Sequence, residues 1–420
     1  MIQRPRGTRD LLPPESRLWQ AVESVARDVF DAFGAEEIRT PLFESTELFV
    51  RSVGESTDIV HKEMYTFTDR KGRSLTLRPE GTASVARAWI ENRLHDRTHP
   101  LRLYYMGPMF RYERMQRGRY RQFSQIGLEI LGANTPLADA ELLLALHELF
   151  TRLGFSDLEF HLNNLGDPED RSRYQQVLRE TLDSHRHGLC SDCQRRLAEN
   201  PLRVLDCKVP ACQQLAARAP SMASVASEAS RAHVAAVEAH LVRLGIPFVH
   251  NERLVRGLDY YLRTVFEVVS PQLGAGTVLC GGGRYDRLIA DLGGPAIPGV
   301  GFAVGEDRLV EVLPEPFRST VLGRSRLYLV PLGPAAAEQA LVLARGWMQA
   351  GVPVEVEVTG RSLKSALKRA DRDALQAVAI LGEDELASGK VAVRDLGRGA
   401  QEHVSPDAVP AWWRRWNAEG

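Results

Sequence analysis

The segment that most constrains the fold covers residues 101–132, LRLYYMGPMFRYERMQRGRYRQFSQIGLEILG. Apolar and aromatic residues fill both of its ends, which predicts two strands joined by a loop. That loop, Arg114–Gln122, is basic and contains Arg114, Arg117, Arg119 and Arg121. The second strand, Phe123–Leu131, alternates so that one face is mostly apolar and is expected to pack on a core; this face carries Ser124, Ile126, Leu128 and Ile130.

The opposite face of the second strand carries Gln125, Gly127 and Glu129. A carboxylate and an amide on a buried face indicate a polar cavity, because unpaired polar groups are costly to bury. Gly127 leaves room for a ligand against the backbone, and Arg111 on the neighbouring strand is expected nearby. The alternative is the solvent-exposed outer face of an ordinary hairpin.

Length and composition bound the class of protein. A chain of 420 residues predicts two or three domains. Its 44% hydrophobic and 25% charged residues are typical of a soluble globular protein. No run approaches the roughly 18 apolar residues of a membrane-spanning helix, and the N-terminal residues lack a signal-peptide core. We therefore expect a cytoplasmic protein, with neither a membrane nor DNA as a partner. The net charge of −1 means that any RNA-binding surface must be local.

The first hundred residues predict a helix followed by strands. Helical spacing of apolar residues covers Glu15–Phe33. A strand over Glu37–Phe43 is broken by Pro41, which suits an edge strand or a subunit contact. A hairpin is expected from Tyr65–Asp69 and Ser74–Leu77, with a tight glycine turn between them.

The stretch RPEGT precedes a predicted helix, Ala83–Asn92. Thr82 is a plausible N-cap for that helix. Glu80 lies at the junction between strand and helix, a place where ligands often bind in open sheets. Glu80 either holds a cationic group there or only interacts favourably with the helix dipole.

A helix over Thr135–Gly154 is followed by a region, about Asp167–Leu244, that is rich in alanine and arginine and predicts an inserted helical domain. It contains two close cysteine pairs, Cys190, Cys193, Cys207 and Cys212. Such pairs can bind zinc, but reduced thiols of a cytosolic protein are the favoured alternative. Cys280 is expected to be an isolated buried residue.

Three further stretches carry candidate binding residues. Leu254–Val268 contains Arg256, a fork-shaped cation suited to phosphate or carboxylate, and Tyr260 and Tyr261, which can line a small pocket. The stretch GGGRYD after Cys280 indicates either a close backbone approach or a flexible turn. Gly299–Leu309 predicts a strand running into a helix. Arg308 at its end is a binding residue or an ordinary surface arginine.

In order, RPEGT, FRYER with its basic loop, QIGLEILG, LVRGLDYY, GGGRYD and GVGFAVGEDRL resemble the motifs of a class II aminoacyl-tRNA synthetase. LVRGLDYY and GGGRYD are similar to those of bacterial histidyl-tRNA synthetases. The resemblance covers nearly the whole chain and leaves only the cysteine cluster unexplained.

The resemblance implies an α+β catalytic domain, residues 1–325, on a mixed and mainly antiparallel sheet flanked by helices. A helical insertion interrupts it at 167–245, and an α/β anticodon-binding domain follows at 326–420. Alternating strands and helices after a linker, Pro314–Ser325, agree with the last domain. Its basic residues Arg361, Lys364, Lys368 and Arg372 are a phosphate-binding stripe or ordinary solvated charges.

The resemblance also implies a reaction: L-histidine and ATP, with Mg²⁺ accompanying ATP, give histidyl-adenylate and pyrophosphate, and histidine is then transferred to the 3′ end of tRNA(His). The implied contacts for the histidine α-amino group are Glu80, Thr82 and Gln125, with Gly81 beside them. Glu129 and Tyr261 would hold the imidazole, with Tyr260 lining the pocket. The implied ATP contacts are Arg111, Glu113, Arg256 and Arg308, of which Arg111 and Arg256 would act at the α-phosphate. The basic loop would close over ATP, and a homodimer is expected.

Two other interpretations remain. A non-catalytic regulatory paralogue would share the fold but is expected to lose Arg256 or the anticodon domain, and both are present. A synthetase for another amino acid, such as proline or threonine, would not need the pair Glu129 and Tyr261. A third interpretation, a binding module without catalytic activity, is the least favoured, because it offers no shared role for Arg111, Arg256 and Arg308.

Overall fold

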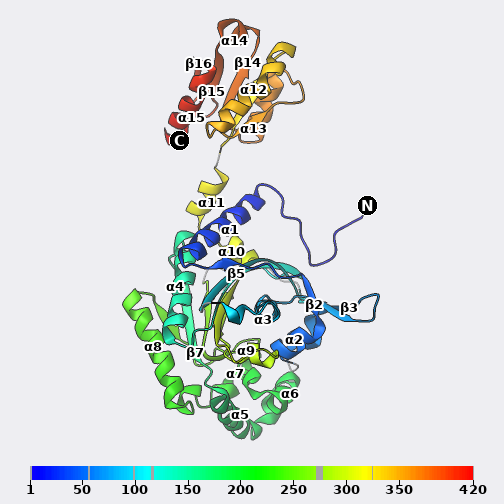
Figure 1. Ribbon diagram of the computed structural model, residues 1–420, viewed down its shortest axis with the longest axis vertical. Helices are drawn as coiled ribbons and strands as arrows, with labels where there is room; N and C mark the ends of the chain where they lie inside the picture. The colour runs from blue at the N-terminus through cyan, green and yellow to red at the C-terminus, as the bar shows by residue number, and fades with distance from the viewer. Residues whose placement is uncertain are drawn as a thin grey trace. The chain divides into compact units, whose positions relative to one another are not determined.

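The computed structural model describes residues 2–54, 57–97, 100–114, 118–270, 278–323 and 325–419. They form two compact units, Met1–Val321 and Leu322–Gly420, each with its own hydrophobic core (Figure 1). Among these residues, no helix is both long enough and apolar enough to span a bilayer.

The larger unit is built on an eight-stranded sheet in the order β1-β5-β6-β11-β10-β9-β7-β8. In that order the strands are Glu36–Glu37, Leu101–Phe110, Gln122–Leu131, Gly299–Gly305, Val278–Arg284, Leu262–Val269, Glu159–Asn164 and Phe248–His250. Among the strand pairs that the described residues form in this sheet, the two outermost, β1–β5 and β7–β8, are parallel and the others are antiparallel. The mixed, mainly antiparallel sheet is therefore confirmed.

The predicted hairpin is the pair β5 and β6, whose register runs from Leu101 opposite Leu131 to Phe110 opposite Gln122. Every residue from Ile126 to Leu131 is buried, so both faces of β6 are covered. This excludes a solvent-exposed outer face for this part of the strand. Arg117 lies outside the described residues.

Helices cover both faces of the sheet. On one face Phe30 of α1 (Glu15–Ala32) contacts the rings of Tyr104 and Phe302 at centroid distances of 5.2 and 6.1 Å. On the other face Trp89 of α3 (Thr82–Glu91) packs in one core with Tyr105. Because Tyr104 and Tyr105 are neighbours on β5, they point to opposite faces. Further α-helices in the described part of this unit, outside the insertion, are α2 (Thr46–Val53), α4 (Pro136–Arg152), α9 (Leu288–Asp291), α10 (Glu306–Glu311) and α11 (Glu315–Leu322).

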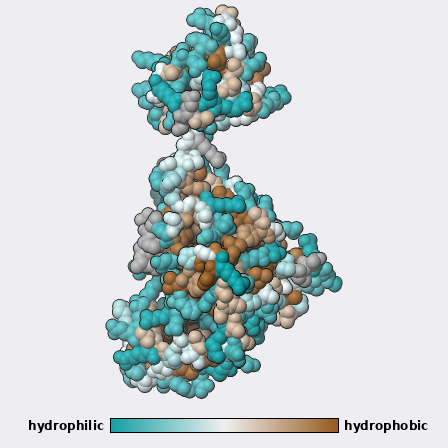
Figure 2. Space-filling view, turned by 90° about the vertical axis from the view of Figure 1, so that its left-hand side faces the viewer, coloured by the Kyte–Doolittle hydropathy of each residue, from teal (hydrophilic) through white to brown (hydrophobic). Residues whose placement is uncertain are grey.

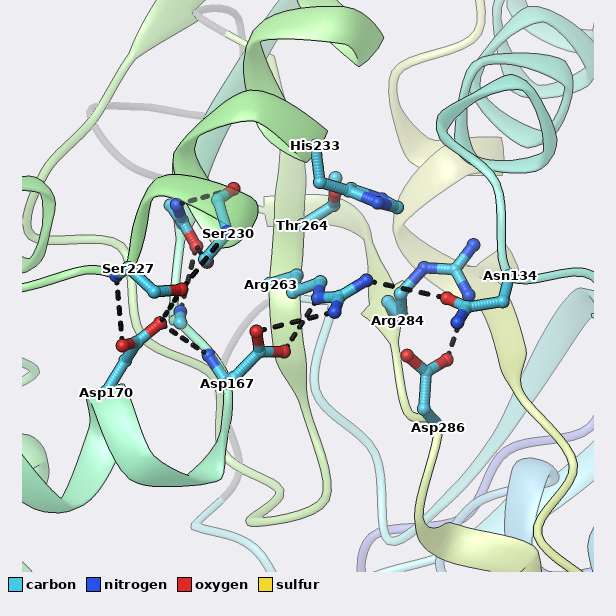
Figure 3. Close-up of polar contacts among 12 residues, drawn as sticks. Asn134, Asp167, Asp170, Ser227, Ser230, His233, Arg263, Thr264, Arg284 and Asp286 are labelled. Atoms are coloured by element: carbon cyan, nitrogen blue, oxygen red, sulfur yellow. Dashed lines mark hydrogen bonds and ion pairs between the residues drawn. The ribbon is translucent and has the colours of Figure 1, made fainter.

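The predicted helical insertion contains α5 (Pro168–Asp183), α6 (Ser191–Glu199), α7 (Pro210–Ala216) and α8 (Glu228–Leu244). Polar contacts tie it to the sheet, as Figure 3 shows. The Arg263 guanidinium of β9 donates to Asp167 at 2.7 Å, just before α5. The Ser230 hydroxyl of α8 donates to Asn164 at the end of β7, at 3.0 Å.

A buried ion pair lies next to this junction. Arg284, at the end of β10, is fully buried and donates to Asp139 of α4 at 2.7 Å. It also donates to Asp286 at 2.8 Å (Figure 3). Asp139 also contacts His233 of α8 and accepts a bond from Thr264 of β9 at 3.1 Å. The GGGRYD stretch is thus a buried strand end, and the alternative of a flexible turn is wrong.

A small sheet, β2-β4-β3, lies beside the main one and contains Phe43–Ser45, Ser74–Leu77 and Tyr65–Thr68. The predicted hairpin is its pair β3–β4. Pro41 separates β1 from β2, as expected, so the single broken strand becomes two short strands in different sheets. Phe43 and Phe67 are half exposed and their rings contact at 6.2 Å between centroids.

The smaller unit has a sheet in the order β13-β12-β14-β15-β16, with parallel pairs at its β13 end. These strands are Val354–Val356, Leu327–Pro331, Ala377–Leu381, Val391–Asp395 and Gln401–Val404, and the helices are α12 (Pro334–Gln349), α13 (Leu363–Arg372), α14 (Glu383–Ser388) and α15 (Val409–Glu419). The side of it seen in Figure 2 is mainly hydrophilic, whereas the larger unit gathers hydrophobic residues in the middle of its visible face.

The predicted linker, Pro314–Ser325, contains the boundary between the two units and is helical over most of its length, because residues 315–322 form α11. Pro316 is compatible with this helix since it lies in the first turn, where the missing N–H would have no helical partner. Ser319 donates to Glu315 at 2.7 Å, and Val321 is buried. Both contacts favour the helix over an extended linker.

Candidate active site

A cavity of about 160 Å³ opens in the larger unit over the face of the sheet that bears α3. Nine of the predicted site residues line it: Glu80, Thr82, Arg111, Glu113, Gln125, Arg256, Tyr260, Tyr261 and Arg308. They come from segments up to about 230 positions apart in sequence, so the fold brings the predicted set together. Gly81 and Glu129 are adjacent but do not line the cavity.

One part of the cavity wall is rich in arginine. Arg308 of α10 donates to the Gly118 carbonyl at 3.2 Å and to the Val278 carbonyl at 2.7 Å, so it is not an ordinary surface residue. Burial lowers the pKa of Arg308, and the nearby positive charge of Arg119 lowers it further. Arg111 is fixed by a 2.8 Å bond to the Pro79 carbonyl.

These arginines have few negative partners. Within the described part of the wall, Glu113 lies 3.8 Å from Arg111 and 3.5 Å from Arg119. Several like charges at this separation repel one another, and a bound polyanion would remove that repulsion. The arrangement is therefore suited to phosphate groups.

Arg256 is held in the cavity by contacts different from those of Arg111 and Arg308. Its guanidinium forms an ion pair with Glu267 of β9 and lies against Gly281 of β10. A Cβ at Gly281 would be 2.1 Å from an Arg256 Nη atom, so only glycine permits this position. Burial alone would lower the pKa of Arg256, but the charge of Glu267 reverses the effect and raises it. Arg256 therefore stays a cation inside the cavity.

Glu80 is buried at the start of α3, where its carboxylate accepts from the backbone N–H groups of Thr82 at 2.6 Å and Ala83 at 2.9 Å. It thus satisfies helix donors and at the same time lines the cavity. The prediction of Thr82 as N-cap is wrong, because Gly81 holds that position and the helix begins at Thr82. The Thr82 hydroxyl instead donates to Glu129 at 2.7 Å.

Glu129 is fully buried behind this wall. One carboxylate oxygen accepts from Thr82 and the other from the Tyr285 hydroxyl. Burial raises the pKa of Glu129 to about 8, although both hydrogen bonds oppose the rise. The carboxylate occupies the space over Gly301, its partner on β11, where a Cβ would be 1.6 Å from Oε2.

The expectation that Gly127 leaves a gap for a ligand is wrong. The ring of Tyr105, the residue paired with Gly127 on β5, fills that space, and a Cβ at Gly127 would be 2.2 Å from the ring. The same ring lies as close to Gly81. Gly127 and Gly81 therefore accommodate a wall of the site, and the open space lies further along the sheet, at Gln125.

Three buried polar atoms of cavity-lining residues have no hydrogen-bond partner among the described residues: Oε1 of Gln125, Nε of Arg256 and the hydroxyl of Tyr260. Native proteins rarely leave such atoms unpaired. Tyr261 lies against Tyr260 at a centroid distance of 4.6 Å, and burial raises its pKa to about 12, so it remains a donor. This part of the wall is suited to a small polar ligand with an aromatic or cationic group.

Sequence reasoning did not find three residues that shape the site. Tyr285 bonds to Glu129, and Tyr105 forms the wall described above. Asp307 lines the cavity, accepts from the Ser124 backbone at 2.8 Å, and pairs with Arg9 at 2.8 Å. Tyr285 is part of the GGGRYD stretch, and the hairpin register places Tyr105 opposite Gly127. No local signal linked Arg9 to Asp307.

Comparison with known proteins agrees with this geometry. The family model described as histidyl-tRNA synthetase matches residues 7–309, and an anticodon-binding-domain model matches 326–416. A "Histidine--tRNA ligase" from Desulfitobacterium hafniense is 46% identical, with 100% of this chain and 99% of the relative covered. Another, from Syntrophotalea carbinolica, is 48% identical over 96% of each chain.

The solved structures agree as well. The apo S. aureus histidyl-tRNA synthetase matches with a TM-score of 0.80 at 36% identity, over 98% of this chain and 99% of that one. An ATP phosphoribosyltransferase regulatory subunit/histidyl-tRNA synthetase from Bacillus halodurans is 24% identical, with a TM-score of 0.67, over 91% and 98% of the chains, and shares the fold. Motifs, fold and full-length relatives coincide, and the chain belongs to the histidyl-tRNA synthetase family.

Proposed function

We propose that this protein is a histidine–tRNA ligase, which joins L-histidine to tRNA(His) at the expense of ATP. The observation that carries the proposal is one cavity in which arginines suited to phosphates adjoin a buried carboxylate and tyrosine wall. The curated full-length relatives support the ligase over the regulatory paralogue, because those at 46% and 48% identity bear the ligase name.

The roles of the residues follow from their chemistry. Glu80 and Gln125 would hold the α-ammonium group of histidine, since a carboxylate and an amide oxygen both accept hydrogen bonds. Thr82 and Gly81 shape the same corner. Tyr260 lines the histidine pocket.

Glu129 and Tyr261 would recognise the imidazole. Glu129 lies behind the cavity wall, so its carboxylate would contact the ring only after the side chains in front of it shift on binding. In its ionised form each carboxylate oxygen accepts one bond, from Thr82 or Tyr285, and retains a second lone pair. A hydroxyl from Tyr261 on the other side of the ring would recognise the second nitrogen. A substrate lacking either ring nitrogen would leave a buried group unpaired, which is a strong basis for discrimination.

Activation requires no protein nucleophile, because the carboxylate of histidine itself attacks the α-phosphate. Arg111 and Arg256 would stabilise charge at that phosphate, and Arg308 would hold the γ-phosphate end. Glu113, between Arg111 and Arg119, would orient these arginines at ATP. Magnesium would accompany ATP and keep most of its waters. Catalysis is then positioning plus electrostatic stabilisation.

The smaller unit would bind the anticodon of the tRNA. Lys364 and Lys368 of α13 are exposed. Arg372 is exposed too but is paired with Asp373 at 2.9 Å, and Arg361 lies 3.9 Å from Glu357. The two lysines are therefore the strongest candidates for phosphate contacts. The basic loop Arg114–Gln122 would meet the acceptor end.

A homodimer is part of the proposal. The small sheet next to Pro41 carries three exposed apolar side chains, Leu42, Phe43 and Phe67. The rings of Phe43 and Phe67 contact each other although β2 and β3 are the opposite edge strands of this sheet. Exposed apolar groups that gather in one place are typical of interfaces. Light scattering at micromolar concentration should give twice the chain mass of 46.8 kDa, and a monomer mass would contradict the dimer.

The activity is tested by ATP–pyrophosphate exchange with each of the twenty amino acids. We expect exchange with histidine alone. Arg256→Ala should reduce it by about three orders of magnitude, a loss comparable to that of other phosphate-binding arginines. Arg253→Ala, which changes an exposed arginine three residues away, is the matched control. Absence of exchange with any amino acid would favour the regulatory paralogue, and exchange with another amino acid would refute the imidazole assignment.

A further inference from the structure

Four cysteines of the insertion meet at one point. Cys190 lies just before α6, Cys193 within it, Cys207 after the following turn, and Cys212 in α7. Their sulfur atoms all lie within 4.8 Å of one another, and none forms a disulfide. Cys190 is partly exposed and the other three are buried. The sequence favoured independent reduced thiols, whereas the fold gathers all four.

The spacing agrees with a tetrahedral metal site. Zinc–thiolate bonds of about 2.3 Å place sulfurs about 3.8 Å apart at the corners of a tetrahedron. The Sγ atoms of Cys190 and Cys207 are 3.9 Å apart. A disulfide would need this separation to fall to about 2.0 Å. Four thiolates around one ion therefore require less rearrangement than two disulfides.

Backbone donors already point at the sulfurs. The N–H of Cys190 donates to Sγ of Cys212 at 3.2 Å, and the N–H of Val209 donates to Sγ of Cys207 at 3.4 Å. Such bonds stabilise thiolate charge and orient metal ligands. They do little for neutral thiols, which are weak acceptors.

The hydrophobic core around the four cysteines is also small. Around the sulfurs it contains only a few apolar side chains, Leu182, Leu189, Leu197, Leu215 and Val204. Helices α6 and α7 have nine and seven residues, which is too short to be stable alone. Small modules of this kind commonly need a metal or disulfides.

The segment held between Cys193 and Cys207 reaches the candidate active site. Its Asn200 and Arg203 both donate to Oδ1 of Asp259, at 3.1 and 3.2 Å. Asp259 directly precedes Tyr260 in the LVRGLDYY stretch. The cysteine module therefore supports the loop that carries the aromatic wall.

We propose that Cys190, Cys193, Cys207 and Cys212 bind one zinc ion as a structural tetrathiolate site. The ion fixes the Asn200–Arg203 segment and, through Asp259, the loop at residues 256–261. This site is separate from the ATP site and takes no part in the chemistry. A thiophilic divalent ion is the ligand that four thiolates select.

Metal analysis of the full-length protein, purified with zinc and reductant and then dialysed, tests the site. We expect one zinc per chain in the wild type and a loss of it in Cys193→Ser. Cys280→Ala, which removes the buried thiol outside the cluster, should keep the metal. The proposal would be overturned if the wild type held less than one zinc per chain or if Cys193→Ser held as much zinc as the wild type. Two disulfides in the reduced preparation would overturn it as well.

A second measurement covers the case in which Cys193→Ser does not fold. Wild-type protein stripped by a chelator is reloaded with cobalt(II), and tetrahedral thiolate coordination should give strong sulfur-to-cobalt absorption. Hydrogen exchange of the stripped protein should then rise at residues 256–261 and fall again with zinc. Weak octahedral absorption would overturn the site, and unchanged exchange would overturn the link to the loop.

Discussion

Replacing Glu129 by glutamine separates the ionisation of this carboxyl from its shape. Glutamine has nearly the same size. One of the Thr82 and Tyr285 hydroxyls can donate to its amide oxygen, and the other can rotate to accept from its NH2 group. The fold and the packing around residue 129 should therefore change little. Because burial raises the pKa of Glu129 to about 8, the wild-type group is mostly neutral at pH 7 in the free protein and the variant loses little charge there.

The effect should appear when histidine binds. An ionised Glu129 that accepts from an imidazole N–H makes a charge-assisted bond worth about 1.5–3 kcal/mol. Its loss should raise the KM for histidine about 10- to 150-fold, since 1.4 kcal/mol is a factor of ten. The KM for ATP should stay within about a factor of two to three, the usual spread of such effects.

The pH dependence follows from the same group. With a pKa of about 8, the ionised fraction of Glu129 rises roughly tenfold between pH 7 and pH 9. The exchange activity at low histidine should rise with it in the wild type. Free histidine titrates as well, but equally for both proteins, so the ratio of wild type to Glu129→Gln isolates the protein group. A ratio that stays constant with pH, or an unchanged KM for histidine, would refute the assignment of Glu129 to the imidazole.

The same carboxyl also affects stability. The folded-state pKa of Glu129 lies above its unfolded value of about 4.5, so the folded form holds a proton that the unfolded form releases. Its stabilising contribution is complete below about pH 4.5 and is lost as the pH rises through about 8. In Glu129→Gln this loss should be absent, and urea titrations at pH 6 and pH 9 measure the difference.

Two further predictions concern the scaffold. Asp139→Asn should lower the free energy of unfolding by about 3–5 kcal/mol, because it leaves the fully buried Arg284 without its main counter-charge; a change below about 1 kcal/mol in urea unfolding would contradict this. Gly127→Ala should lower the free energy of unfolding by about 1–3 kcal/mol, because its Cβ would be 2.2 Å from the ring of Tyr105. Gly346→Ala in α12, where nothing lies within 4 Å, should instead stabilise by about 0.5–1 kcal/mol. Equal effects of the two alanines on the thermal midpoint would refute the steric argument.

Patterns that repeat along a short segment predicted much of the fold. Alternation in β6, helical spacing in α1 and the glycine turn between β3 and β4 all record local geometry, which the neighbours in sequence determine. The N-cap of α3 was predicted wrongly, and the helix α11 within the linker was not predicted. Both depend on contacts that the local pattern does not contain, such as the reach of the Glu80 carboxylate to two backbone donors.

The residues of the candidate site were predictable because a family resemblance supplied them, and polar groups on the buried face of β6 pointed the same way. Their partners were not predictable. Gly127 illustrates this, because a missing side chain on a strand shows that something occupies the space but not whether it is a ligand or the protein itself. The register of β5 and β6 decides the matter, and it places Tyr105 there.

Three glycines of the sheet therefore serve the same purpose, which is to leave space for a large side chain of another residue. Tyr105 lies against Gly127, Glu129 against Gly301, and Arg256 against Gly281. In each case a Cβ would lie within about 2.2 Å of that side chain, closer than any real contact. A substitution at any of the three would thus displace a wall or a charged group of the cavity while leaving the site residues themselves intact. The specificity of the cavity depends on backbone that lacks side chains as much as on the side chains that line it.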